Sequence, residues 1–142
     1  METKFEYELQ SKGQIVFVTE GDSMMPMLHQ HKDVVVIKSV AEPIKKYDVV
    51  LFKRPTGEYV LHRVIKCCGC GEYKIAGDNR AFSEIVPEGW IIGILSEIIR
   101  DGIHIAAHSP EYKAYTKKLP LRRFKLKVKR YLSAIKRRLK KH

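Results

Sequence analysis

The stretch DVVLFKRPTGEYVLHRVIKC, residues 48–67, decides the fold class of this chain. Two runs rich in β-branched and aromatic residues, 48–53 and 58–67, flank the turn residues PTG at 55–57. Residues of the first kind favour strands, and Pro and Gly favour the tight turn between them. The stretch therefore predicts a β-hairpin.

The same pattern of short apolar runs and turn residues continues on both sides of this hairpin. Asp101-Gly102 is a favoured two-residue hairpin turn. Many short strands at close spacing predict a mainly β fold, a coiled antiparallel sheet or a small barrel. A short helix is predicted at residues 3–11 and ends before Gly13. The further strands are predicted at residues 14–19, 33–40, 72–76, 90–99 and 103–107.

After residue 107 the pattern becomes helical. Ser109-Pro110 is typical of a helix start, and a break at Pro120 precedes a second helical stretch. Apolar residues recur there at steps of three and four, which predicts an apolar stripe under a basic face. We therefore expect a β catalytic domain at 1–107 and a basic amphipathic tail at 108–142. The stripe residues are Phe124, Val128, Tyr131, Leu132, Ile135 and Leu139.

The net charge of +11 is concentrated in that tail. Residues 117–142 hold 13 of the 27 Lys and Arg and none of the 16 acids, so residues 1–116 are nearly neutral. The tail can be a solvated helix on the body, an anchor on an anionic membrane surface through residues 119–142, or a nucleic-acid-binding element. We place the membrane above nucleic acid because the stripe gives bilayer burial something to act on.

The sequence also indicates a compartment. No window approaches the roughly 20 consecutive apolar residues of a membrane-spanning helix, and the acidic, mixed N-terminus does not resemble a secretory signal. Cys67, Cys68 and Cys70 are too crowded for a disulfide framework and lack the second ligand pair of a structural zinc site. We expect a cytoplasmic protein, peripheral on the inner membrane face through its tail, with no metal and no cofactor.

The segment GDSMMPML, residues 21–28, is the first candidate for chemistry. Ser23 lies between a strand end and a Pro-limited turn, where its hydroxyl can be exposed and its backbone N–H free, as a nucleophile beside an oxyanion site requires. Asp22, Met24 and Pro26 would support that turn. Ser and Asp before Pro are also ordinary turn residues, so the segment alone decides nothing.

His62 is the second candidate. Strand alternation places it on the opposite face from Arg63. If Leu61 and Ile65 face the core, His62 lies on the more accessible face, where a neutral imidazole can take a proton from a serine. A hydrogen-bonded surface histidine is the alternative interpretation.

Asp78, in the segment AGDNR at 76–80, is the third candidate. It can cap a turn, or it can accept the second N–H of His62 and so fix the tautomer of the ring. Arg63 and Asn79 would then support the site as neighbours of His62 and Asp78.

Together these segments resemble the conserved boxes of signal peptidases. SMMP at 23–26 resembles the Ser-Met-x-Pro box, and YDVV at 47–50 followed by HRV at 62–64 resembles the next two boxes in order. GDN at 77–79 resembles the Gly-Asp-Asn box. The resemblance spans about residues 15–100, and the same fold superfamily includes the self-cleaving LexA-type repressors.

The resemblance implies a LexA-like coiled sheet and a serine endopeptidase. Because His62 stands where bacterial signal peptidases have Lys, the chain is similar to the histidine branch of the family. This implies Ser23 as nucleophile, with its N–H as oxyanion donor, His62 as general base and Asp78 as the orienting acid. The implied substrates are extended leader-type peptides with small residues at the first and third positions before the cut, added to a sheet edge as a strand. Signal peptidases carry a transmembrane anchor before the serine box, which the segment before Ser23 does not resemble.

Three alternatives stay open at this stage. A catalytically inactive peptide-binding or membrane-peripheral adaptor of the same fold would use the groove without cleavage. A nucleic-acid-binding protein would act through the tail alone. Self-processing, as in the repressors, is disfavoured because the single Ala-Gly bond, at Ala76-Gly77, lies inside the proposed Asp box.

Overall fold

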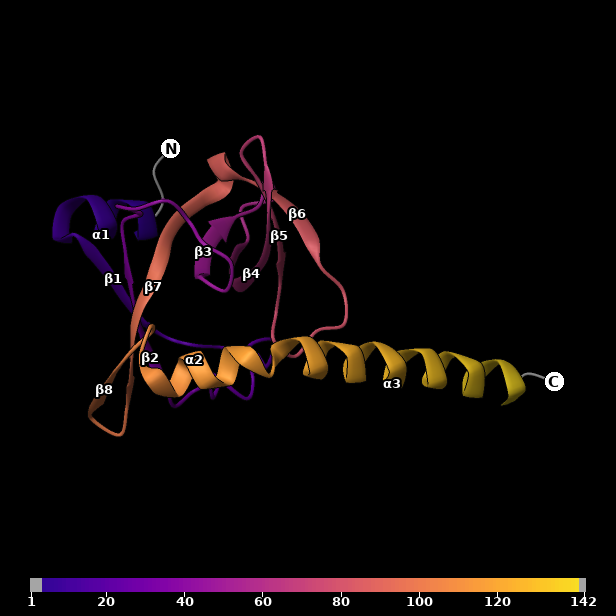
Figure 1. Ribbon diagram of the computed structural model, residues 1–142. Helices are drawn as coiled ribbons and strands as arrows, with labels where there is room; N and C mark the ends of the chain where they lie inside the picture. Colours follow the sequence, from indigo (N-terminus) through magenta and orange to yellow (C-terminus); the bar gives the residue numbers. More distant parts are fainter. Residues whose placement is uncertain (1–3, 141–142) are drawn as a thin grey trace.

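The computed structural model describes residues 4–140, a β-sheet with helices toward both ends of the chain (Figure 1). The helical elements are α1 (Lys4–Lys12), the 3-10 turn η1 (Glu88–Trp90), α2 (Pro110–Lys117) and α3 (Leu119–Lys140). The strands are β1 (Gln14–Val18), β2 (Val34–Lys38), β3 (Val49–Lys53), β4 (Tyr59–Gly69), β5 (Glu72–Ala76), β6 (Glu84–Pro87), β7 (Ile91–Arg100) and β8 (Ile103–Ala106).

The strands form one sheet in the order β1-β2-β7-β3-β4-β5-β6, with β8 paired to β7, and every recorded pairing is antiparallel. The prediction of a mainly antiparallel β fold between helical ends is therefore confirmed. β6 was not predicted, because four residues that end in Pro carry little strand signal.

The hairpin predicted from residues 48–67 is present as β3 and β4, in a register that pairs Val50 with His62. Its turn is closed by backbone hydrogen bonds between Arg54 and Glu58 and from Gly57 to Arg54, and Gly57 has φ of 91°. The predicted turn at Asp101-Gly102 joins β7 to β8.

Both faces of the curled sheet are covered, so the described chain has two apolar clusters. One cluster lies under α1 and α2, where Phe5 of α1 stacks on Phe17 of β1 with ring centroids 5.2 Å apart. Its buried members are Ile15, Met24, Met27, Leu28, Val35, Ile37, Val49, Leu51, Leu95, Ile98 and Tyr112. The other lies between β3, β4, β5 and β6, with buried members Ile44, Val50, Phe52, Val60, Val64, Ile75 and Val86.

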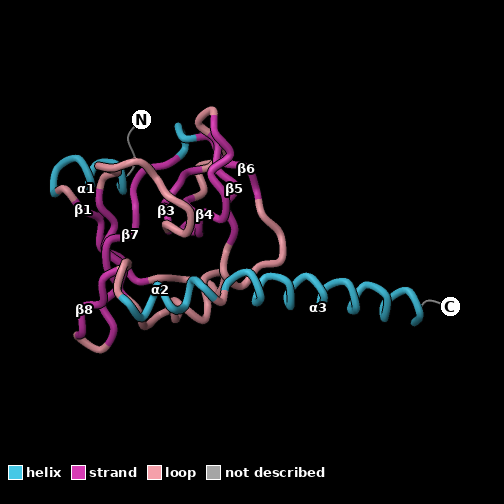
Figure 2. The backbone as a smooth tube through the Cα atoms, viewed as in Figure 1, coloured by secondary structure: helices cyan, strands magenta, loops and turns pink. Residues whose placement is uncertain are grey.

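The start of the tail belongs to the body. Ser109 caps α2 by accepting a hydrogen bond from the Tyr112 backbone N–H, as expected, and the Tyr112 side chain is buried in the first cluster. Figure 2 shows loops of the body beside α2 and the first turns of α3. The division expected at residue 107 therefore falls inside the packed body.

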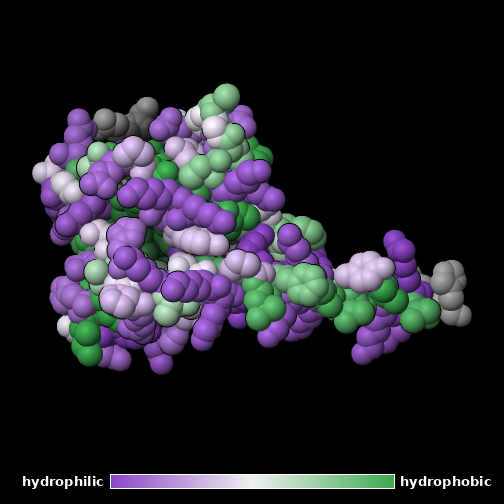
Figure 3. Space-filling model, viewed as in Figure 1, coloured by the Kyte–Doolittle hydropathy of each residue, from purple (hydrophilic) through white to green (hydrophobic). Residues whose placement is uncertain are grey.

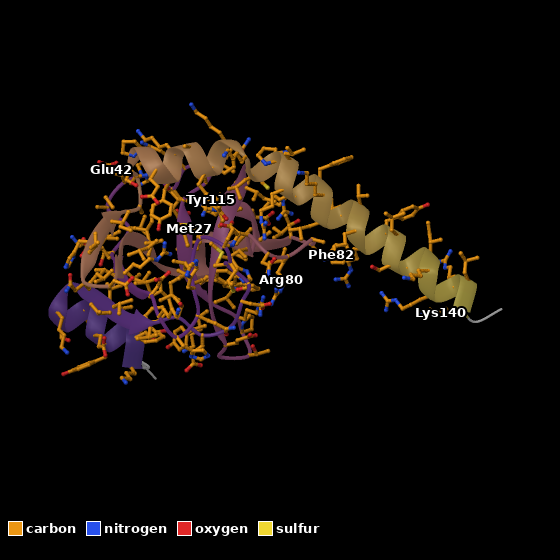
Figure 4. The ribbon with its side chains drawn as sticks, turned by 90° about the horizontal axis from the view of Figure 1, so that it is seen from below. Met27, Glu42, Arg80, Phe82, Tyr115 and Lys140 are labelled. Atoms are coloured by element: carbon orange, nitrogen blue, oxygen red, sulfur yellow. The ribbon has the colours of Figure 1, made fainter. Side chains whose placement is uncertain are left out.

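The rest of α3 extends away from the sheet (Figure 1), and Lys140 lies at its far end (Figure 4). The interpretation of the tail as a helix packed along the body is therefore wrong for this part. Across residues 4–140, none of the helices combines the length and the apolar character that crossing a membrane requires.

Candidate active-site groove

A groove of about 740 Å³ holds two of the three predicted site residues, Ser23 and His62. One side comes from β1 and the loop after it, and the other from β3 and β4. β1 is an edge strand, since it pairs only with β2 in the described sheet. The residues that line the groove are Lys4, Phe5, Phe17, Val18, Thr19, Glu20, Gly21, Ser23, Met24, Leu28, Leu51, Arg54, Glu58, Tyr59, Val60, Leu61, His62 and Arg80.

Ser23 lies on the loop that follows β1, with its side chain half-buried. Its backbone carbonyl accepts a 2.8 Å hydrogen bond from the Asn79 N–H. Within residues 4–140, neither its hydroxyl nor its own backbone N–H has a hydrogen-bond partner. Both groups are thus free to meet a ligand, as a nucleophile and an oxyanion donor must be.

An ion pair between the buried Asp33 and Arg100 holds the C-terminal end of the loop that carries Ser23. Arg100 donates to both carboxylate oxygens of Asp33 and to the Met27 carbonyl, and Asp33 is fully buried. Although burial opposes it, the hydrogen bond from Arg100 keeps the pKa of Asp33 below its usual value. Met24 is buried in the first cluster, and the Met25-Pro26 peptide is cis.

We expected His62 on the more accessible face only if Leu61 and Ile65 faced the core. Both faces of β4 are covered, and His62 is half-buried on the face of the second cluster. It shares its side of β4 with Val60 and Val64, which are buried in the second cluster, and its ring meets Phe52 edge-on with centroids 6.3 Å apart. Alternation distinguishes the two faces of a strand but not which face another layer covers. Burial lowers the pKa of His62 to about 4, with Glu84 opposing this shift and Arg54 adding to it. The imidazole is therefore neutral at pH 7, as a general base requires.

Gly77 brings the two candidates to one point. A Cβ on Gly77 would lie 2.6 Å from the Ser23 carbonyl oxygen and 3.2 Å from His62 Nε2. Because Gly77, directly after β5, has no side chain, the serine loop and the imidazole can both lie close to it. No hydrogen bond joins the Ser23 hydroxyl to the His62 ring in the part of the chain that the structure describes.

Asp78 is committed to other partners. Arg63 donates to its two carboxylate oxygens at 2.8 and 2.9 Å, and the Tyr115 hydroxyl donates to Oδ2 at 2.8 Å. Among the described residues, Asp78 makes no hydrogen bond to His62, so the expected orienting contact is absent. Its influence on the imidazole is a weak charge effect, and Glu84 raises the pKa of His62 more than Asp78 does.

Arg63 and Asn79, expected to support the site, both form hydrogen bonds to the loop that carries Ser23. Besides Asp78, Arg63 contacts the Tyr47 carbonyl and the Met27 sulfur. Asn79 donates from its side chain to the Asp22 carbonyl at 3.2 Å.

Two arginines extend these ties. Arg80 forms an exposed ion pair with the Asp22 carboxylate at 2.6 Å. Arg122 of α3 donates to the carbonyls of Met25 and Asp78 and to Asn79 Oδ1.

Sequence reasoning missed Tyr115, Arg122, Arg100 and Asp33. The first two lie in the tail, whose basic character hid their contacts with the body. In Figure 4, Tyr115 points from α2 into the body near Met27. A partial signal existed for Asp33, because an acid directly before an apolar strand needs a cation or donors when it is buried.

The three cysteines lie outside the groove. Cys67 and Cys68 at the end of β4 and Cys70 in the turn that follows are exposed free cysteines, and Cys70 and Gly71 have positive φ. Over residues 4–140, no group of three or more His, Cys, Asp or Glu side chains could hold a metal ion.

Comparison with known proteins assigns neither a family nor a function to this chain. No protein family model matches the chain, and no curated protein sequence matches it.

Proposed function

We propose that this chain is a serine endopeptidase of the signal-peptidase kind, with a LexA-like coiled sheet, in which Ser23 is the nucleophile and His62 the general base. The observation that carries the proposal is that both residues line one groove beside the edge strand β1, with Gly77 against both. The box resemblance over residues 15–100 supports the same assignment.

In the proposed reaction, the Ser23 hydroxyl oxygen attacks a peptide carbonyl carbon while its proton moves to the neutral His62 ring. The developing oxyanion would be stabilised by the Ser23 backbone N–H, which is free of partners among residues 4–140. The peptide C–N bond then breaks as His62 returns the proton to the amine, and water hydrolyses the acyl-enzyme. Because Asp78 is paired with Arg63, the proposed machinery is a Ser–His dyad, and Asp78 holds the loops that carry it.

The substrate we propose is an extended leader-type peptide with small residues before the cut. Such a peptide can add to β1 as a further strand, since main-chain hydrogen bonds to a free sheet edge provide affinity without requiring particular side chains. The Val16 and Val18 side chains are about half exposed on this strand. We propose a cytoplasmic location as well, with peptides or regulatory proteins of that compartment as substrates.

The test is the pair Ser23→Ala and Ser39→Ala, assayed on an alanine-rich leader peptide and with a fluorophosphonate probe. Ser39 is an exposed loop serine outside the groove and serves as the matched control. We expect Ser23→Ala to lose both cleavage and labelling with an unchanged unfolding midpoint, and Ser39→Ala to keep both. Cleavage retained by folded Ser23→Ala would remove Ser23 as nucleophile.

A second function is favoured by one observation, the absence of a hydrogen bond between Ser23 and His62 within the described chain. A non-catalytic peptide-binding module of the same fold would need the groove but not the dyad. It predicts no probe labelling of the wild type together with leader-peptide binding that survives Ser23→Ala.

A further inference from the structure

The apolar stripe of α3 is uncovered along its whole length. Its members lie between 37 and 73% exposed, and α3 has no acidic residue. In Figure 3, hydrophobic side chains gather along the projecting helix between hydrophilic ones. Leu121 extends the stripe predicted from the sequence by one turn. The exposed stripe residues are thus Leu121, Phe124, Val128, Tyr131, Leu132, Ile135 and Leu139.

The stripe points away from the body. At about 100° per residue, its members fall within an arc of about 100° on the helix surface. The residues that contact the body lie on the opposite side: Leu119 is buried, Arg122 and Arg123 donate to loop carbonyls, and Arg130 lies 4.4 Å over the Phe82 ring. Even Leu121 and Phe124, next to the body, are 59 and 63% exposed. The body therefore cannot cover the stripe without detaching the helix.

The positive charge of α3 decides which kind of partner can cover the stripe. A second copy of α3 would place two rows of Lys and Arg beside one another with no acid on either helix, which is repulsive. Nucleic acid would neutralise the cations but would leave the stripe in water. An anionic bilayer surface takes apolar side chains into its acyl boundary and cations at its headgroups at the same time.

We propose that α3 is an interfacial helix that attaches the protein to the surface of an anionic lipid bilayer, with its stripe buried and its long axis in the membrane plane. Lys125 and Lys136 flank the stripe and line a shallow hollow on the surface of α3, separate from the active-site groove. They lie where lipid headgroups would meet them. This inference is independent of cleavage, because no stripe residue lines the groove that holds Ser23.

The test is co-sedimentation of the full chain with phosphatidylcholine vesicles that contain or lack phosphatidylglycerol. We expect binding to the anionic vesicles only, weaker at high salt, and reduced roughly fivefold for each cation removed from the helix. Lys136→Gln and Lys140→Gln measure that dependence.

The stripe is tested by the double variant Leu132→Gln and Leu139→Gln, which keeps every charge and a good helix former at each position. Binding should fall by about tenfold or more, since apolar burial carries much of the affinity. The control, Val40→Gln with Ile85→Gln, also replaces two exposed aliphatic side chains by Gln, at positions away from α3, and should bind like the wild type. Circular dichroism checks that helix content is unchanged.

Three results would overturn the proposal: equal binding to both kinds of vesicle, unchanged binding of the stripe variant, or a dimer in sedimentation equilibrium that the stripe variant abolishes. Unchanged vesicle binding by Ser23→Ala would support it. Loss of cleavage in that variant concerns only the peptidase assignment, so the two proposals can fail separately.

Discussion

Arg63 donates from Nε and Nη2 to the two carboxylate oxygens of Asp78, and both side chains are almost completely buried. Removal of one partner leaves an uncompensated buried charge, which typically costs about 3–5 kcal/mol. We therefore expect Asp78→Ala to lower the free energy of unfolding by about that amount, measured by denaturant titration.

The same pair distinguishes a structural from a catalytic role for Asp78. Arg63→Met should destabilise to a similar extent, and the double variant Arg63→Met with Asp78→Ala should lose clearly less than the sum of the two single changes, because the two residues interact. A folded Asp78→Ala of normal stability that has lost all activity would instead restore Asp78 to the catalytic machinery.

Gly77→Ala tests the contact between the serine loop and the imidazole. The new Cβ would lie 2.6 Å from the Ser23 carbonyl oxygen, a backbone atom that cannot move without its loop. Overpacking of this kind costs about 1–3 kcal/mol, and we expect cleavage to fall further than stability. Gly89→Ala is the matched control, because a Cβ there meets nothing within 4 Å, and it should leave both quantities unchanged. Equal behaviour of the two variants would contradict the proposed site.

The pKa of His62, lowered to about 4 by burial, sets a pH dependence for catalysis. A general base must be neutral, so the acidic limb of kcat/KM for leader-peptide cleavage should have its midpoint near pH 4 rather than near 6.5. A midpoint near 6.5 would show that the catalytic base is not this buried imidazole.

The same shift predicts a change in stability. Between pH 6.5 and about 4 the unfolded chain binds a proton at His62 that the folded chain does not. The free energy of unfolding is therefore higher above pH 6.5 and decreases as the pH falls toward 4. His62→Gln does not titrate. The difference in unfolding free energy between wild type and His62→Gln should therefore vary across that window and be constant above it, as denaturant titrations in a pH series would show.

Arg122 should matter more than its place in a basic tail suggests. It donates to carbonyls on both loops of the site, so Arg122→Gln should cost about 1.5–3 kcal/mol of stability and reduce cleavage. Arg138→Gln makes the same charge change on the same helix away from the body and should do neither. Thermal unfolding and peptide cleavage of the two variants decide this, and indistinguishable results would mean that the tail is not part of the site.

Local patterns in the sequence were sufficient for every strand except β6. Two-residue alternation and turn residues placed the β3–β4 hairpin, and Ser109 with Pro110 placed the start of α2. The cover over His62 could not be predicted, because which side of β4 another layer covers depends on β5 and β6, which lie later in the chain. The partners of Asp78 could not be predicted either, since Arg63 and Tyr115 lie 15 and 37 positions away and reach it only when β4 and α2 take their places in the fold.

The register of the β3–β4 hairpin places two neighbouring residues, His62 and Arg63, on opposite faces of β4, where they have different roles. His62 points toward the groove and Arg63 toward the buried acid, and the length of the turn between Arg54 and Glu58 fixes which residue does which. Insertion of a single residue into β4 before this pair would move His62 to the place of Arg63 and Arg63 to the place of Val64. A cation would then lie in the second apolar cluster, and an imidazole cannot neutralise Asp78 as a guanidinium does.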